Sequence, residues 1–216
     1  MIRTNNTLIR IRSVRVGSQF DYDAQAFITA AGITDATQQS AINTLVVSAK
    51  TNGWWSLCNA IYPFVGGSAS SHKFNLKNPV DSDAAFRLSF AAGWTHSSTG
   101  ATPNGSTYAD TFIIPSVNLT QDDTSLSFYS RTNVVGGNYV DMGVFQVTNS
   151  VPRLSMEADF GGNFAADHYG GAGGRITVAR QNTAAFYLSS RTTSAVFKAF
   201  RNGTQLSVTQ TGAAGT

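Results

Sequence analysis

The sequence predicts a mainly β protein: an antiparallel β-sandwich of jelly-roll type, preceded by a short helical hairpin and an N-terminal arm. Beyond residue 54, short segments of alternating apolar and polar residues recur between turn signals, as in antiparallel sandwiches. Only residues 21–53 show the spacing of amphipathic helices. We therefore divide the chain into an extended arm (residues 1–20), a helical hairpin (residues 21–53) and a sandwich (residues 54–216).

The arm alternates like a strand, but its apolar positions change face near Arg12. A β-bulge would explain this slip, and so would an extended segment lying against another subunit. The arm has no acidic residue and holds four of the 15 basic residues: Arg3, Arg10, Arg12 and Arg15. These arginines fit either an anchoring arm that docks on an acidic surface or an edge strand whose positive charge opposes aggregation.

Two helices are predicted within residues 21–53. The first carries an apolar stripe and ends at Gly32. The second begins at Asp35, whose carboxylate is expected to accept a hydrogen bond from the amide of Gln38. In return, the side chain of Gln38 is expected to accept a hydrogen bond from the amide of Asp35, which completes a capping box. Gly53 ends the helix. The short connection between them predicts an αα-hairpin.

The strands of the sandwich are predicted from period-two alternation. The clearest unit is a hairpin whose turn contains Asn202 and Gly203, because Asn-Gly between alternating segments favours a two-residue turn. The predicted strands cover residues 85–90, 125–130, 139–145, 153–158, 175–179, 185–189, 195–200 and 204–209.

Composition narrows the classes of function. Charged residues are 12% of the chain, about half the ~25% of an average soluble protein, and the net charge of +3 is too small to indicate nucleic-acid binding. No apolar run is long enough to span a membrane, and the first residues lack the apolar region of a secretory signal. Cys58 is the only cysteine, which excludes an intrachain disulfide and a metal site built from cysteines. We expect no cofactor.

Candidate catalytic and metal-binding residues are few. Glu157 and Asp159 share one face of a predicted strand and could form the carboxylate pair of a glycan hydrolase, although a solvated strand face is the simpler interpretation. We therefore expect no enzyme. Aspartates in loops could bind calcium as in some sandwich lectins, but Asp residues of this kind more often cap turns: Asp81, Asp83, Asp122, Asp123 and Asp141.

Aromatic residues on predicted loops are the remaining candidates. Sugar rings stack on exposed aromatic side chains, so Tyr108, Tyr139 and Tyr169 are candidate glycan contacts, and Phe160 and Phe164 belong to the same group of predicted loop aromatics. Most of the 24 aromatic residues of a sandwich this size are nevertheless expected to fill its core.

Several motifs together resemble a module of phage and prophage virion proteins, common in phages of Bacteroidetes-type hosts. The likeness runs from about Asp23 to the C-terminus. It rests on FITAAGITD (27–35), QQSAIN (38–43), WW (54–55), AIYPFVGG (60–67), NLKNP (75–79), GWTHSSTG (93–100) and YSRTN (129–133).

The resemblance implies a concanavalin A-like or laminin-G-like sandwich in a structural protein displayed on virion heads, fibres or tails. It implies no catalytic residues, and it places the protein in the virion with other virion proteins and a host surface glycan as partners. Members of that family continue past the last hairpin, so either the sequence is truncated or a neighbour donates strands to an open edge, as in a homo-oligomer.

Overall fold

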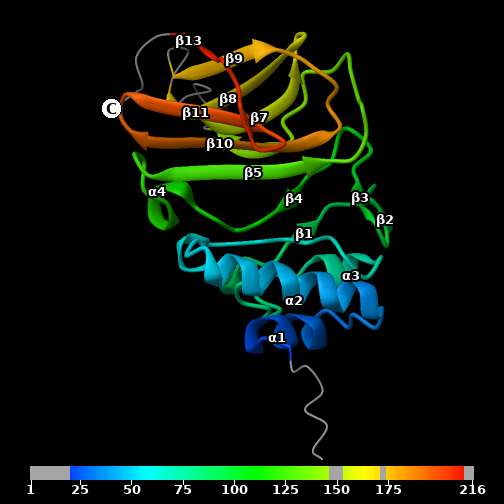
Figure 1. Ribbon diagram of the computed structural model, residues 1–216. Coiled ribbons are helices and arrows are strands. Elements are labelled where there is room, and N and C mark those ends of the chain that lie inside the picture. Colours follow the sequence, from blue (N-terminus) through cyan, green and yellow to red (C-terminus); the bar gives the residue numbers. More distant parts are fainter. Residues whose placement is uncertain (1–19, 146–152, 171–173, 212–216) are drawn as a thin grey trace, which may run out of the picture. The chain divides into compact units, whose positions relative to one another are not determined.

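The structure, a computed structural model, describes residues 20–145, 153–170 and 174–211 and forms two compact units (Figure 1). The helical unit ends at Phe112 and the two-sheet unit begins at Ile113. This division differs from the expected boundary after Gly53, because residues 54–112 belong to the same unit as the helical hairpin. The arm residues Arg3, Arg10, Arg12 and Arg15 lie outside the described residues.

The predicted helical hairpin is present as α1 (Tyr22–Ala30) and α2 (Ala36–Thr51). Gly32 takes a φ of 64° in the turn, a left-handed conformation that glycine adopts without strain. Asp21 caps α1, and Lys50 near the end of α2 forms ion pairs with both Asp21 and Asp23 at 2.6 Å. The facing sides of the two helices form an apolar core with Phe74 and Leu76 from the segment after α2. Its helical members are Ala24, Phe27, Ile28, Ile42 and Val46.

Short elements complete the helical unit. They are η1 (Trp55–Leu57), α3 (Ala69–His72), η2 (Asp83–Ala85), β1 (Ser89–Phe90), β2 (Thr95–Ser97), β3 (Gly100–Thr102) and β4 (Ala109–Asp110). β1 pairs with β4 and β2 with β3, both antiparallel. The buried side chain of Asn75 joins the loops, because it accepts from the amide of Ile61 and donates to the carbonyls of Asn59 and Ala85.

The two-sheet unit is mainly β, as predicted, and its sheets are antiparallel. One four-stranded sheet has the order β12-β11-β10-β5, and one five-stranded sheet has the order β13-β9-β8-β7-β6. A short helix, α4 (Pro115–Asn118), precedes them. The strands are β5 (Thr124–Ser130), β6 (Met142–Phe145), β7 (Arg153–Phe160), β8 (Asn163–Gly170), β9 (Arg175–Ala179), β10 (Ala185–Thr193), β11 (Val196–Arg201), β12 (Thr204–Gln205) and β13 (Thr209–Thr211).

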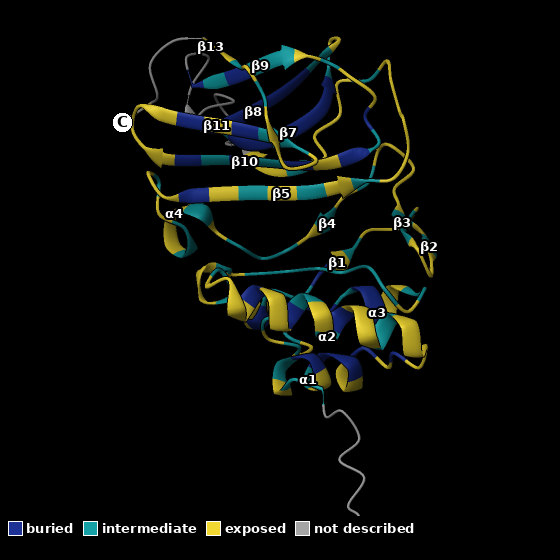
Figure 2. Cartoon of the chain, viewed as in Figure 1, coloured by how far each residue is buried: buried dark blue, intermediate teal, exposed yellow. Residues whose placement is uncertain are grey.

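Both sheets contribute to one core. Tyr187 of β10 stacks on Phe164 of β8 with ring centroids 5.1 Å apart and on Phe128 of β5 at 5.4 Å. Around these rings lie small and apolar side chains from both sheets: Met156, Ala158, Ala166, Ile176, Ala185, Phe197 and Ala199. Figure 2 shows that β7 and β8 are almost entirely buried, so the outer face of the five-stranded sheet is covered along these strands.

A buried arginine ties the end of β10 to the segment before β5. Arg191 is 1% exposed, and its Nη1 donates to the carbonyl of His168 at 2.7 Å. Its Nη2 lies 2.6 Å from Asp122, and the guanidinium lies over the ring of Phe197. Asp122 is therefore the counter-charge of a buried cation.

Several strand predictions differ from the structure. Of the predicted strand 139–145, only Met142–Phe145 is a strand. Only Ser89–Phe90 of the predicted strand 85–90 is extended, because residues 83–85 form a 3₁₀ turn and Phe86 takes a φ of 56°. Phe164 lies in the core strand β8 rather than in a loop, and no strand was predicted for residues 163–170.

The predicted hairpin at Asn202-Gly203 is present, with both residues at positive φ. Its second strand is short: β12 joins the four-stranded sheet, and β13 then joins the five-stranded sheet.

Candidate functional site

The three tyrosines predicted to contact glycans lie in different places. Tyr108 is 72% exposed and belongs to the helical unit. Tyr139 is 59% exposed in the loop before β6. Tyr169 lies at the end of β8, and its hydroxyl is buried without a hydrogen-bond partner in the described part of the chain.

Register keeps the two tyrosines of the two-sheet unit apart. Asn138, next to Tyr139, bridges to Phe160 at one end of β7, whereas Gly170, next to Tyr169, pairs with Arg153 at the other end. Seven residue steps along a strand are about 23 Å. Tyr139 and Tyr169 therefore do not line one sugar-binding surface.

A different pair of aromatic residues comes together on the outer face of the four-stranded sheet. Tyr129 of β5 and Phe186 of β10 are directly opposite each other in the ladder and are 66% and 41% exposed. Leu188 and Phe200 pair in the next row of the same face. We call these four residues the aromatic face.

The aromatic face follows from the alternation of its strands. In β5, Ser125, Ser127 and Tyr129 point outward, while Leu126 and Phe128 pack against the core. Hydroxyl groups lie farther along the same face, where the Oγ of Ser125 donates to the Oγ of Ser190 at 3.0 Å. The face combines apolar aromatic surface with hydroxyl groups, the chemistry that recognises sugars, and exposed Lys198 opposite Ser190 adds one charge.

The carboxylates that the sequence singled out do not form a pair. Glu157 approaches Asp167 of β8 instead, because Ser155 Oγ lies 3.4 Å from Glu157 Oε1 and donates to Asp167 Oδ2 at 3.2 Å. Arg175 Nη2 lies 2.7 Å from Asp167 and 3.6 Å from Glu157, and Arg153 is 3.8 Å from both acids. Two acids and two arginines thus make a balanced cluster on the outer face of β7, β8 and β9.

Burial governs the ionisation of this cluster. Glu157 is 2% exposed, and burial raises the pKa of its carboxyl group, opposed by the nearby Arg175. Its Oε2 has no hydrogen-bond partner among the described residues. The hydroxyl of Ser155 bridges the carboxylates of Glu157 and Asp167, and both acids are paired with arginines.

Asp159 has a separate structural role. Its carboxylate accepts hydrogen bonds from the amides of Gly136 and Gly162 and forms an ion pair with Arg180 at 2.6 Å. These bonds, led by the Gly136 amide, lower the pKa of Asp159. The side chain fixes the loop before β6 to the β7–β8 turn.

Four of the aspartates considered for calcium also have protein partners, including Asp122, which pairs with Arg191. Asp81 pairs with Lys73 and Arg87, and Asp83 pairs with Arg87. Asp141 accepts from the amide of Ala158. In the described ranges, no three histidine, cysteine, aspartate or glutamate side chains gather where they could hold a metal ion.

Two histidines meet in the helical unit, a contact that sequence spacing does not reveal. The Nδ1 atoms of His72 and His96 are 2.9 Å apart, so one ring donates and the other accepts. Burial and the neighbouring imidazole lower the pKa of His72 to about 4. Phe64 and Phe90 pack edge-on against this pair.

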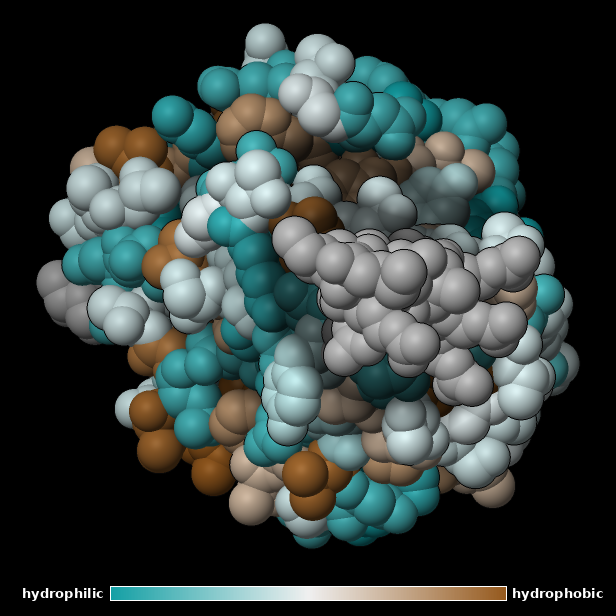
Figure 3. All heavy atoms as spheres, turned by 60° about the horizontal axis from the view of Figure 1, so that its bottom comes forward, coloured by the Kyte–Doolittle hydropathy of each residue, from teal (hydrophilic) through white to brown (hydrophobic). Residues whose placement is uncertain are grey.

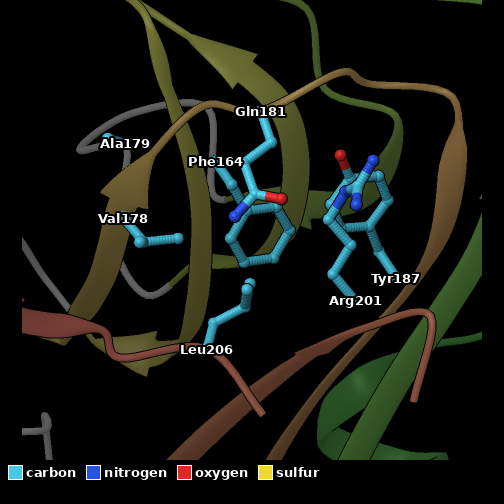
Figure 4. A pocket seen from close by; sticks show the side chains of 7 residues that line it. All are labelled: Phe164, Val178, Ala179, Gln181, Tyr187, Arg201 and Leu206. Carbon is cyan, nitrogen blue, oxygen red and sulfur yellow. The ribbon is translucent and has the colours of Figure 1, made fainter. Parts of the chain in front are cut away.

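The hollow in Figure 4 is part of the core. It lies between the sheets beside the stacked rings of Phe164 and Tyr187, and Arg201 and Gln181 line its polar side. It has no space for a water molecule. The face shown in Figure 3 carries hydrophobic residues in small separate groups among hydrophilic ones.

Within residues 20–145, 153–170 and 174–211, no helix is both long and apolar enough to cross a membrane. Comparison with known proteins found no match to the chain, whether among protein families, curated proteins or solved structures.

Proposed function

We propose that the chain is a structural protein of a bacteriophage virion, a head or tail decoration or a fibre component, that displays a β-sandwich on the particle surface. The two-sheet unit would be a jelly roll of the concanavalin A-like or laminin-G-like class. The observation that supports this proposal is the two-sheet unit itself: its sheets share a core of their own and leave the outer face of the four-stranded sheet exposed. The resemblance of the sequence motifs to virion proteins is the reason for proposing a location on the virion.

The test is the composition of purified particles. Phage grown on the host should contain the protein in stoichiometric amounts by mass spectrometry, and antibody fragments against the two-sheet unit should decorate intact particles in electron micrographs. Antibodies against a known internal head protein serve as the negative control. Absence of the protein from purified particles would end the proposal.

A second function, binding of a host surface glycan, is favoured by the aromatic face. Tyr129 and Phe186 lie side by side and exposed, with serine hydroxyls on the same sheet face. Aromatic stacking contributes about 1 kcal/mol for each ring, so a single sandwich would bind a sugar weakly and many copies on a particle would bind it by avidity.

Truncation of the exposed rings tests the glycan function. On a glycan array probed with an oligomeric form of the protein, Tyr129→Ala should weaken binding about fivefold. Tyr139→Ala should weaken it equally only if the loop before β6 contributes. Tyr22→Ala, which removes a tyrosine that is 84% exposed in the helical unit, is the matched control and should bind normally. Binding unchanged by Tyr129→Ala excludes the aromatic face.

A further inference from the structure

β5 is an open and unprotected edge. It is the last strand of the four-stranded sheet, and its seven residues pair with β10 alone among the residues that the structure describes. The other sheet edges are shorter, with two residues in β12, three in β13 and four in β6. Edge strands are usually protected by proline, by charged side chains or by a β-bulge. β5 contains no proline and no charged residue, and its register with β10 is unbroken.

The ladder shows which backbone groups of β5 face the open side. The carbonyl of Phe186 accepts from the amide of Asn202, beyond the end of β11, and the amide of Phe186 donates to Asn202 Oδ1, so both backbone groups of Phe186 point away from β5. Because directions alternate along an antiparallel strand, Tyr187 and Ser189 bond to β5 at Phe128 and Leu126. The N–H and C=O groups that point outward belong to the alternate residues Ser125, Ser127 and Tyr129.

The hydrophobic core is also open at this edge. Leu126 and Phe128 face the core but are only partly buried. A strand added beside β5 would cover them with its own inward side chains, and its outward side chains would lie beside Ser127 and Tyr129.

The N-terminal arm has the pattern that such a strand requires. In residues 8–14, Ile9 and Ile11 alternate with Arg10 and Arg12. The two isoleucines would cover the partly buried side of β5, and the two arginines would lie on the solvent side, where a guanidinium can stack on Tyr129. The charges are complementary at the start of β5, because the arm has no acidic residue and exposed Asp123 directly precedes the strand, whereas Arg131 follows its other end.

We propose that residues 8–14 of one copy add as a strand to β5 of a second copy. The arm leads into Phe20, which packs on the core of the helical unit, whereas β5 belongs to the two-sheet unit, so each copy carries a donor and an acceptor on separate units. Donation from copy to copy is heterologous and links copies in a series. The proposal does not depend on the virion role.

Variants can block the donor and the acceptor separately. Ser127→Pro removes one outward N–H without breaking the ladder to β10, and Ser127→Ala removes the same hydroxyl but keeps the N–H. Deletion of residues 1–16 removes the donor. In sedimentation velocity, the full chain and Ser127→Ala should associate with increasing concentration, whereas Ser127→Pro and the deletion should each remain monomeric.

Mixing the two blocked proteins gives the decisive result. Ser127→Pro retains the donor and the deletion variant retains the acceptor, so the mixture should form a one-to-one dimer and nothing larger. In hydrogen exchange, the amides of Ser125, Ser127 and Tyr129 should exchange about tenfold more slowly in the full chain than in the deletion variant. A monomeric full chain that protects these amides would show donation within one copy and overturn the proposal, as would association that Ser127→Pro leaves unchanged.

A peptide avoids dependence on the folding of Ser127→Pro. A synthetic peptide of residues 5–16 should bind the deletion variant and protect the same three amides, and a peptide with Ile9→Glu and Ile11→Glu should not. Equal behaviour of the two peptides would contradict the proposed pairing.

Discussion

His168 is a buried imidazole in the core of the two-sheet unit. It is fully buried, and its Nε2 lies 2.7 Å from the Oγ of Ser189. Burial, reinforced by the charge of Arg191, lowers the pKa of His168 to about 4. An unfolded chain binds a proton at this side chain below about pH 6.5, whereas the folded chain does not until about pH 4.

Stability of the two-sheet unit should therefore fall with acid over that window. The contribution of His168 is fully present above pH 6.5 and is lost as the pH falls toward 4, by up to about 3 kcal/mol. Urea unfolding followed by circular dichroism at a series of pH values measures this slope. His168→Gln should be less stable at neutral pH but flatter between pH 6.5 and 4, and an unchanged slope would contradict the assignment.

Helix α2 depends on a single capping residue. Asp35 accepts a hydrogen bond from the amide of Gln38 at 2.8 Å, and no acidic residue lies in the first turn. Asp35→Ala should destabilise the helical unit by about 1 kcal/mol, whereas Asp35→Asn, which can still cap, should cost much less. All three tryptophans lie in this unit, so the shift of the fluorescence midpoint in urea measures both variants. Equal effects of the two substitutions would exclude capping as the cause.

The same helix start shows how far local sequence patterns reach. The cap at Asp35 was predicted correctly because both partners lie within one turn. The capping-box role of Gln38 was wrong: its side chain accepts from the amide of Gly66 and donates to the carbonyl of Ser98. Those partners are distant in sequence, and only the fold brings them near.

Strand β8 shows the same limit for sheets. Its inward positions are Phe164, Ala166 and His168, and the small Ala165 lies between them on the other face, so both faces are buried and the alternation is weak. The aromatic face was missed for a related reason. The alternation of residues 125–130 shows that Tyr129 points away from the core, but its pairing with Phe186 depends on the register of strands far apart in sequence.

At the scale of the whole molecule, the boundary between the units could not be predicted. Residues 54–112 contain aromatic residues and turn signals like those of the β region, yet their short strands pair only within the helical unit. The buried Asn75 and the His72–His96 contact organise this region, and neither leaves a periodic pattern.

Two separate cores predict two separately unfolding units. Ile42 is 3% exposed in the core of the helical unit, Ile176 is fully buried in the core of the two-sheet unit, and the two clusters share no residue. Ile→Val removes one buried methylene and costs about 1 kcal/mol of unfolding free energy at either site.

Ile42→Val should lower the urea midpoint of tryptophan fluorescence and leave the hydrogen exchange of the slowest amides of β8 and β10 unchanged. Ile176→Val should do the reverse, because each methylene stabilises only the core that contains it. If both variants shift both readouts equally, the chain unfolds as one cooperative unit, and the division between Phe112 and Ile113 has no thermodynamic counterpart.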